Sequence, residues 1–172
     1  MKIGPLPKDL DLRSLAARSV VIKGTASLDA LPRLSESEIG LEAPVVAELQ
    51  FRRDEEGRYV VETSVEATLT LTCQRCLDGM SLPLVAGSTM ACVWNDSDAA
   101  ALPSGLEPLV VGETADLNEI VEEELLLAAP VSPVHEKDCL IDRGGEESAK
   151  ESVLSPDPGR TNPFSVLKDL RT

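Results

Sequence analysis

The chain has 172 residues, of which 16 are basic and 30 acidic, and its formal net charge at pH 7 is −14. This length suits one domain with its own core rather than two. An acidic chain repels phosphate, and only 2% of the residues are aromatic, so the composition argues against a large surface for binding nucleic acid.

Residues 1–40 carry mixed signals. Residues 9–20 are compatible with a short helix, residues 20–28 with a strand and residues 35–40 with a polar turn. Residues 1–7 lack the apolar core of a secretion signal, and no apolar run approaches the ~18 residues of a membrane span. We therefore expect a cytoplasmic protein without a membrane partner, whose cysteines are thiols or metal ligands rather than disulfides.

Two segments in the middle of the chain, residues 45–52 and 59–71, alternate apolar with mostly polar residues. Alternation with a period of two predicts strands with one buried face. The turn residues 54–57 between them predict an antiparallel hairpin. A third strand is expected over residues 80–94, at an edge or a bulge, because Pro83 has no backbone donor.

Residues 116–128 have the pattern of a helix. Asp116 is a candidate N-cap with Glu119 three residues later, and Pro130 follows the end. Five apolar residues form the expected buried stripe: Leu117, Ile120, Val121, Leu125 and Ala128. The three glutamates at 122–124 are expected on the solvent side, because a solvated face accounts for them without a function.

The predicted fold class is α+β: an antiparallel hairpin or meander sheet with one packed helix in a single domain, residues 1–142. An acidic linker rich in glycine and proline, residues 143–159, should be mobile. Residues 160–172 then form a short amphipathic segment that should bind a partner or dock on the chain's own domain. Its features are a cap, a proline at the first helical position and apolar residues at helical spacing: Asn162, Pro163, Phe164, Leu167 and Leu170.

Cysteine and histidine spacing indicates a possible metal site. Cys73 and Cys76 form a C-x-x-C pair between two predicted strands, and His135 and Cys139 form an H-x-x-x-C pair. Zinc in structural sites takes four such ligands, provided that the chain after the helix folds back over the turn. The alternatives are thiols without a metal, with Cys92 buried in a strand, or a redox pair. The redox pair fits less well, because thioredoxin-type pairs lie at a helix N-terminus.

No pattern of a catalytic site is present. His135 is the only histidine, and the chain contains no nucleophile elbow, phosphate-binding glycine loop or dinucleotide fingerprint. The carboxylates show no pairing across an apolar cleft. We therefore expect no enzyme activity and no small-molecule substrate.

Three stretches, considered together, resemble the bacterial YceD family of large ribosomal RNA subunit accumulation proteins. They are LTCQRC at residues 71–76, VEEELLLAAPVSPVH at residues 121–135 with Cys139 after it, and NPFSVLKDL at residues 162–170. The resemblance covers about residues 40–172. It implies a role in the synthesis, processing or stability of 23S ribosomal RNA and no known catalysis. Some relatives carry further cysteines after the helix, as in a zinc ribbon, but here residues 141–145 replace the later pair.

The charge suggests how such a role is performed. Residues 94–157 hold sixteen acids and three bases, so a basic ribosomal or ribosome-assembly protein is the expected partner. Direct contact with RNA stays open through a small basic patch of four arginines: Arg52, Arg53, Arg58 and Arg75. The alternative function is a metal- or redox-responsive regulator that uses the C-x-x-C thiols.

Overall fold

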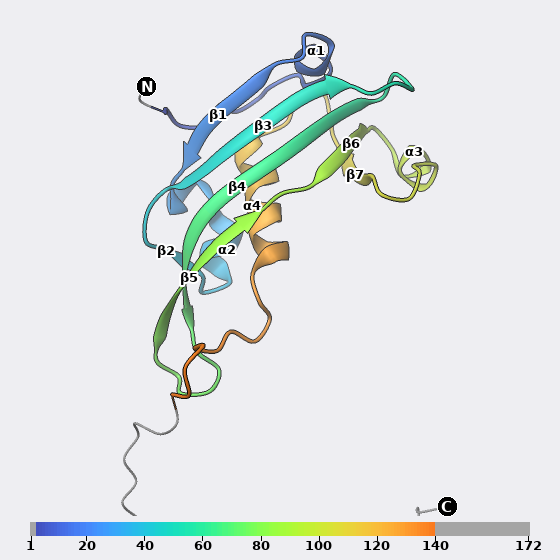
Figure 1. The fold of residues 1–172 in the computed structure, drawn as a ribbon. Helices are drawn as coiled ribbons and strands as arrows, with labels where there is room; N and C mark the ends of the chain where they lie inside the picture. The colour runs from blue at the N-terminus through green and yellow to red at the C-terminus, as the bar shows by residue number, and fades with distance from the viewer. Residues whose placement is uncertain (1–2, 140–172) are drawn as a thin grey trace, which may run out of the picture. The chain divides into compact units, whose positions relative to one another are not determined.

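The computed structural model describes residues 3–139 (Figure 1). Residues 3–139 belong to one compact unit. The predicted linker and the amphipathic segment with Asn162, Pro163, Phe164, Leu167 and Leu170 lie outside the described residues. Within the described part, no helix is both long and apolar enough to cross a membrane.

A seven-stranded sheet forms the centre of the unit. Its main path runs β1-β3-β4-β6-β7, and β2 and β5 also pair with β4. The strands are β1 Val21–Ala26, β2 Gly40–Leu41, β3 Val45–Arg53, β4 Tyr59–Thr72, β5 Gly79–Ala86, β6 Thr89–Val93 and β7 Glu107–Val110. All pairs are antiparallel except β6–β7, which is parallel. The prediction of an α+β fold around a mostly antiparallel sheet is confirmed.

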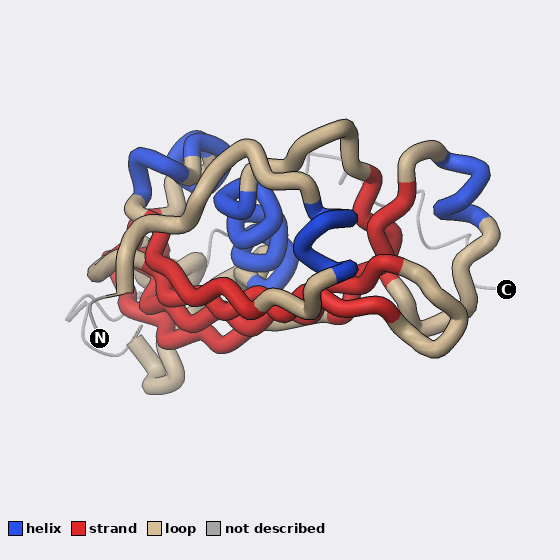
Figure 2. Tube along the Cα trace, turned by 90° about the horizontal axis from the view of Figure 1, so that it is seen from above, coloured by secondary structure: helices blue, strands red, loops and turns tan. Residues whose placement is uncertain are grey.

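Most of the helices lie on one side of this sheet, but the short helix that follows β6 lies apart from them, beyond the β6–β7 end (Figure 2). The helices are α1 Leu12–Ala17, η1 Leu28–Ala30 (a 3₁₀ turn), α2 Pro32–Glu36, α3 Asp96–Ala100 and α4 Leu117–Ala128. The prediction of one packed helix was too simple, because α1 and α2 also bury leucines in the core, Leu12, Leu15 and Leu34. The covered face of the sheet carries the alternate residues of β3 and β4, which are buried, while their neighbours are mostly more exposed.

The third predicted strand is present but interrupted. β5 and β6 both pair with β4 in one continuous register, and the ladder breaks only at Gly87 and Ser88. There Thr63 N donates to Ser88 O at 2.9 Å, and Ser88 N donates to Thr63 Oγ1 at 3.0 Å. A Cβ atom at Gly87 would lie 2.3 Å from Thr63 O, so this close approach of two backbones requires glycine.

Pro83 lies on the free edge of β5, as expected. It is opposite Thr68 in the ladder, and Thr68 O accepts from Glu42 N at 3.1 Å on the other side of β4. The backbone groups of this pair therefore point away from each other. The donor that proline lacks would have faced outward, and the sheet loses no hydrogen bond.

Residues 35–40 were predicted as a polar turn, and this is partly wrong. Ser35 and Glu36 complete helix α2, which begins with Pro32 at its first turn. Proline is favoured there because its missing N–H has no helical partner in any case. The buried side chain of Leu34 then anchors this short helix in the core.

Helix α4 begins at its predicted cap, because the Asp116 side chain accepts from Asn118 N at 2.8 Å. Four residues of the expected stripe are buried, and Ala128 is half-buried. The expectation that all three central glutamates face solvent was wrong for two of them: Glu122 is 2% exposed and Glu124 7% exposed.

Each of these two buried carboxylates accepts a hydrogen bond from another element. Glu122 Oε1 accepts from Leu34 N at 3.0 Å, at the N-terminal turn of α2. Glu124 accepts from the hydroxyl of Ser88, at the break between β5 and β6. Glu123, between them, is exposed and forms an ion pair with Arg33. Hydrogen-bond donors from other elements thus account for the burial of Glu122 and Glu124. Helical periodicity cannot predict such donors, because they belong to distant parts of the chain.

We expect Glu122→Ala to lower the free energy of unfolding by about 2 kcal/mol, because it leaves the buried amide of Leu34 without an acceptor. Glu123→Ala is the matched control and should change stability little, because it removes only an exposed ion pair. Urea denaturation of both variants would measure the difference. Equal stability losses in the two variants would contradict the assigned role of Glu122.

Candidate metal centre

The connection between β4 and β5 is a tight turn that holds Cys73 and Cys76 together. Cys73 N donates to Asp78 O at 2.9 Å, and Leu77 N donates to Cys73 O at 2.9 Å. Inside the turn, Arg75 N donates to Cys73 Sγ at 3.4 Å. Leu77 closes it with a φ of +64°, a left-handed conformation that glycine adopts at no steric cost. The turn therefore wraps around the Sγ atom of Cys73.

The segment after α4 folds back over this turn. Gln74 N donates to Pro133 O at 2.8 Å, and Pro133 is buried. The guanidinium of Arg75 reaches the carbonyl oxygens of His135 and Lys137 and the carboxylate of Asp138, each at 3.4 Å. These contacts supply the fold-back on which the predicted four-residue site depended.

The structure brings together all four predicted ligands, Cys73, Cys76, His135 and Cys139. One candidate ligand atom from each residue lies within 4.8 Å of the other three. The Sγ atoms of Cys73 and Cys139 are 3.8 Å apart, and Cys76 Sγ is 3.4 Å from His135 Nδ1. For a tetrahedral zinc ion, ordinary bond lengths imply edges of about 3.8 Å between sulfurs and about 3.6 Å between sulfur and nitrogen. The separations within these two pairs are close to those edges.

The two thiols of the turn have different electrostatic environments. Burial raises the pKa of Cys73, but the backbone N–H groups of Cys76, Arg75 and His135 outweigh it and hold that pKa at about 5. For Cys76 the backbone N–H of Asp78 lowers the pKa, but burial and the neighbouring thiols of Cys139 and Cys73 outweigh it and raise the pKa to about 11. Cys73 is therefore prepared to act as a thiolate ligand.

Cys92 is separate from this cluster. It is buried in β6, and burial raises the pKa of its thiol to about 11. It behaves as a small apolar residue of the core. The argument against a redox pair was incomplete, because the amides of the turn lower the pKa of Cys73 without a helix N-terminus.

The arginines do not form the basic patch considered from the sequence. Arg52 pairs with Glu62, and Arg58 pairs with Asp54 beside the β3–β4 turn. Arg75 follows the opposite end of β4, whose 14 residues span on the order of 40 Å. Local acids thus neutralise Arg52 and Arg58, the guanidinium of Arg53 lies over the ring of Tyr59, and the length of a strand separates Arg75 from the others.

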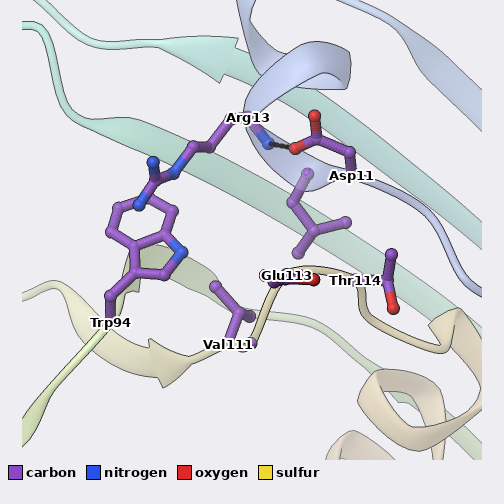
Figure 3. Close-up of a pocket in the computed structure, with 8 residues that line it drawn as sticks. Asp11, Arg13, Trp94, Val111, Glu113 and Thr114 are labelled. Carbon is purple, nitrogen blue, oxygen red and sulfur yellow. Dashed lines mark hydrogen bonds between the residues drawn. The ribbon is translucent and has the colours of Figure 1, made fainter.

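Trp94, the single tryptophan, lines a small hollow near α1 and packs against neighbouring side chains there (Figure 3). Its volume is about 270 Å³. The guanidinium of Arg13 stacks on Trp94 at 3.6 Å from the ring centroid, and Tyr59 meets Trp94 edge to face at 5.7 Å. Both polar aromatic rings therefore already have internal partners, which leaves less ring surface for nucleobases.

Sequence reasoning missed the contacts that shape the site. Arg75 was considered only as a surface cation, and Leu77 gave no signal because its left-handed conformation is one that sequence patterns assign to glycine or asparagine. The carbonyl of Pro133 is a backbone group and has no signature in the sequence.

The comparisons with known proteins agree on one family. A family model described as "Large ribosomal RNA subunit accumulation protein YceD" matches residues 61–171. A Haemophilus influenzae protein with the same description is 31% identical to this chain, and the matched region covers 96% of this chain and 96% of the relative. No solved structure matches the chain significantly.

We expect Leu77→Gly to raise the free energy of unfolding by up to about 1 kcal/mol, because glycine removes the strain of the left-handed conformation. Leu77 is 66% exposed, so little buried contact is lost. Val85→Gly, at an exposed position of β5 with ordinary backbone, is the control and should lower stability by about 1 kcal/mol. Thermal unfolding of both would show opposite signs, and a loss of stability in both would contradict the assignment of strain.

Proposed function

The chain belongs to the YceD family, and on that premise we propose that it is a non-enzymatic factor that promotes the accumulation of 23S ribosomal RNA. The observation that carries this proposal is a family match over residues 61–171, together with a relative of the same description that is similar along almost the whole chain. Accumulation here means synthesis, processing or protection of the RNA.

The factor acts through a basic protein rather than by coating RNA. The net charge of −14 repels phosphate. The pairing of Arg52 and Arg58 with acids, and the packing of Trp94 with Arg13, support this proposal. Ribosomal proteins and ribosome-assembly factors are the proposed class of partner, because electrostatic complementarity accelerates association and selects between partners.

The Cys₃His cluster serves as a structural zinc site within this function. Its four ligands would close a tetrahedron and leave no position for a substrate, as in structural rather than catalytic zinc sites. The ion would tie the β4–β5 turn to the segment after α4, which otherwise depends on Arg75 and the Gln74–Pro133 hydrogen bond. This arrangement favours a structural ion over a metal- or redox-responsive regulator.

The amphipathic segment that contains Asn162, Pro163, Phe164, Leu167 and Leu170 stays a predicted partner-binding element. The family match extends to residue 171 and so includes it. Its apolar spacing suits a groove on another protein.

We predict that the purified chain binds one zinc ion, and that Cys76→Ala abolishes this binding because it removes a ligand. Cys92→Ala is the matched control and should keep the ion, since Cys92 lies outside the cluster. Cobalt substitution would report a tetrahedral thiolate site by its visible absorption, and binding should weaken as the pH falls because protons compete for thiolates. Zinc binding by the Cys76 variant at the level of the control would overturn the site.

Depletion of the protein from cells should lower 23S relative to 16S ribosomal RNA, and the wild-type chain should restore the ratio. Quantitative measurement of both RNAs through the depletion would follow it. A chain truncated after residue 159 should restore the ratio poorly if the amphipathic segment binds the partner. An unchanged ratio in depleted cells would remove the proposed function.

A further inference from the structure

A groove with a volume of about 950 Å³ runs between β7 and α4. Strand β7 contributes all four of its residues and two that follow, and helix α4 contributes three exposed and three buried residues. Because the groove runs along consecutive residues of β7, a ligand bound in it could reach the backbone of this strand as well as its side chains. This volume is at the upper end for small-molecule sites, and the groove is open to solvent.

Strand β7 ends the sheet and has a free backbone edge. Among the strands of residues 3–139 it pairs with β6 alone, in parallel. Val111 N donates to Val93 O at 2.9 Å, and in a parallel ladder alternate residues turn their groups to the same neighbour. Leu109 therefore faces β6, while Pro108 and Val110 direct their backbone groups away from it. The N–H and C=O of Val110 and the C=O of Pro108 are thus available to a further strand.

Helix α4 lines the opposite side with residues spaced by four, Glu119, Glu123 and Leu127. This spacing places them on one helix face. Leu127 is 71% exposed, and Val110 on β7 is 56% exposed. Both sides of the groove therefore combine carboxylates with exposed apolar surface, which suits a chain that carries both kinds of side chain.

The charge of the groove is strongly negative. Six carboxylates and two cations line it. Lys8 pairs with Asp116, and Arg33 pairs with Glu123. The buried Glu122 and Glu124 are bonded within the fold. Two glutamates on opposite sides, Glu107 and Glu119, form no direct ion pair among the described residues, although Glu119 lies close enough to Arg33 to raise the pKa of that guanidinium.

We propose that this groove binds an extended, lysine- or arginine-rich segment of a partner protein as a short added strand on β7. Main-chain hydrogen bonds to Val110 would hold the segment, and basic side chains would meet Glu107 and Glu119, in the mode of β-strand addition. Pro108 limits the added strand to a few residues. The inference rests on the proposed function, because it gives the basic partner its docking surface.

The charges select a basic peptide over other occupants. RNA would bring phosphates beside unpaired carboxylates, which is unfavourable. A second copy of the chain carries the same net charge of −14 and would add self-repulsion. An extended basic segment satisfies both the charges and the free edge of β7.

The test uses the full chain and a fluorescein-labelled octapeptide of alternating lysine and valine, with binding followed by anisotropy. An octapeptide with glutamate in place of lysine should not bind, and salt should weaken binding of the basic peptide. The double variant Glu107→Gln and Glu119→Gln should weaken binding about tenfold. Glu66→Gln, on the other face of the sheet, is the control for nonspecific charge and should bind as the wild type does.

Two further measurements test the binding mode. Peptides methylated on one or the other alternate set of backbone nitrogens should differ, because only one set faces β7. The amide resonance of Val110 should shift on binding. Equal binding of both methylated peptides, or an equal effect of Glu66→Gln and the double variant, would overturn the proposal. So would a shift of the same amides by single-stranded RNA but not by peptide, or dimerisation that the double variant abolishes.

Complementation separates this inference from the proposed function. If depletion lowers 23S ribosomal RNA and the double variant restores it fully, the groove inference fails and the function stands. If the groove binds the peptide as expected while depletion leaves the ratio unchanged, the function fails and the groove remains a peptide site. Failure of the double variant to restore the ratio supports both.

Discussion

Strand β4 is the constraint on which the rest of this structure depends. It pairs with β3 and β2 on one side and with β5 and β6 on the other. Its inward residues form the centre of the aliphatic core, and burial of each such side chain contributes about 1.5–3 kcal/mol. A shift of its register by one residue would turn this apolar set to solvent. The cysteine turn and the β3–β4 hairpin turn occupy its two ends, so β4 also sets their separation.

The acidic residues of this chain have several structural roles that their number conceals. Glu122 accepts from the N-terminal turn of α2, Glu124 accepts from the break between β5 and β6, and Asp116 caps α4. Other acids neutralise arginines. Glu107 and Glu119, in the groove beside β7, are among the carboxylates that form no ion pair within the described residues, and they are a small part of the total charge. The net charge describes long-range attraction of a basic partner, whereas a docking position depends on which carboxylates stay unpaired.

The metal centre and the groove differ in the kind of preorganisation they show. At the centre, backbone amides surround the sulfur of Cys73 and hold its pKa at about 5, and Arg75 fastens the segment that carries His135 and Cys139. In the groove, the preorganised element is a strand edge with unused hydrogen-bonding groups. The first arrangement favours an ion that stabilises the chain's own fold, and the second favours a peptide from outside it.

The sequence by itself indicated β1, β3, β4 and the β5–β6 region, the main helix and the identity of the four candidate ligands, because alternation, capping and cysteine spacing are local patterns; it gave no sign of β2 or β7. Tertiary structure alone decided which glutamates are buried, since their donors, Leu34 N and Ser88 Oγ, belong to segments distant in the chain. It also decided the break at Gly87, the left-handed Leu77 and the separation of the arginines along β4. The fold-back that joins Cys73 and Cys76 to His135 and Cys139 depends on long-range backbone contacts. Such contacts involve backbone N–H and C=O groups, which nearly every residue carries, so no pattern of side chains predicts them.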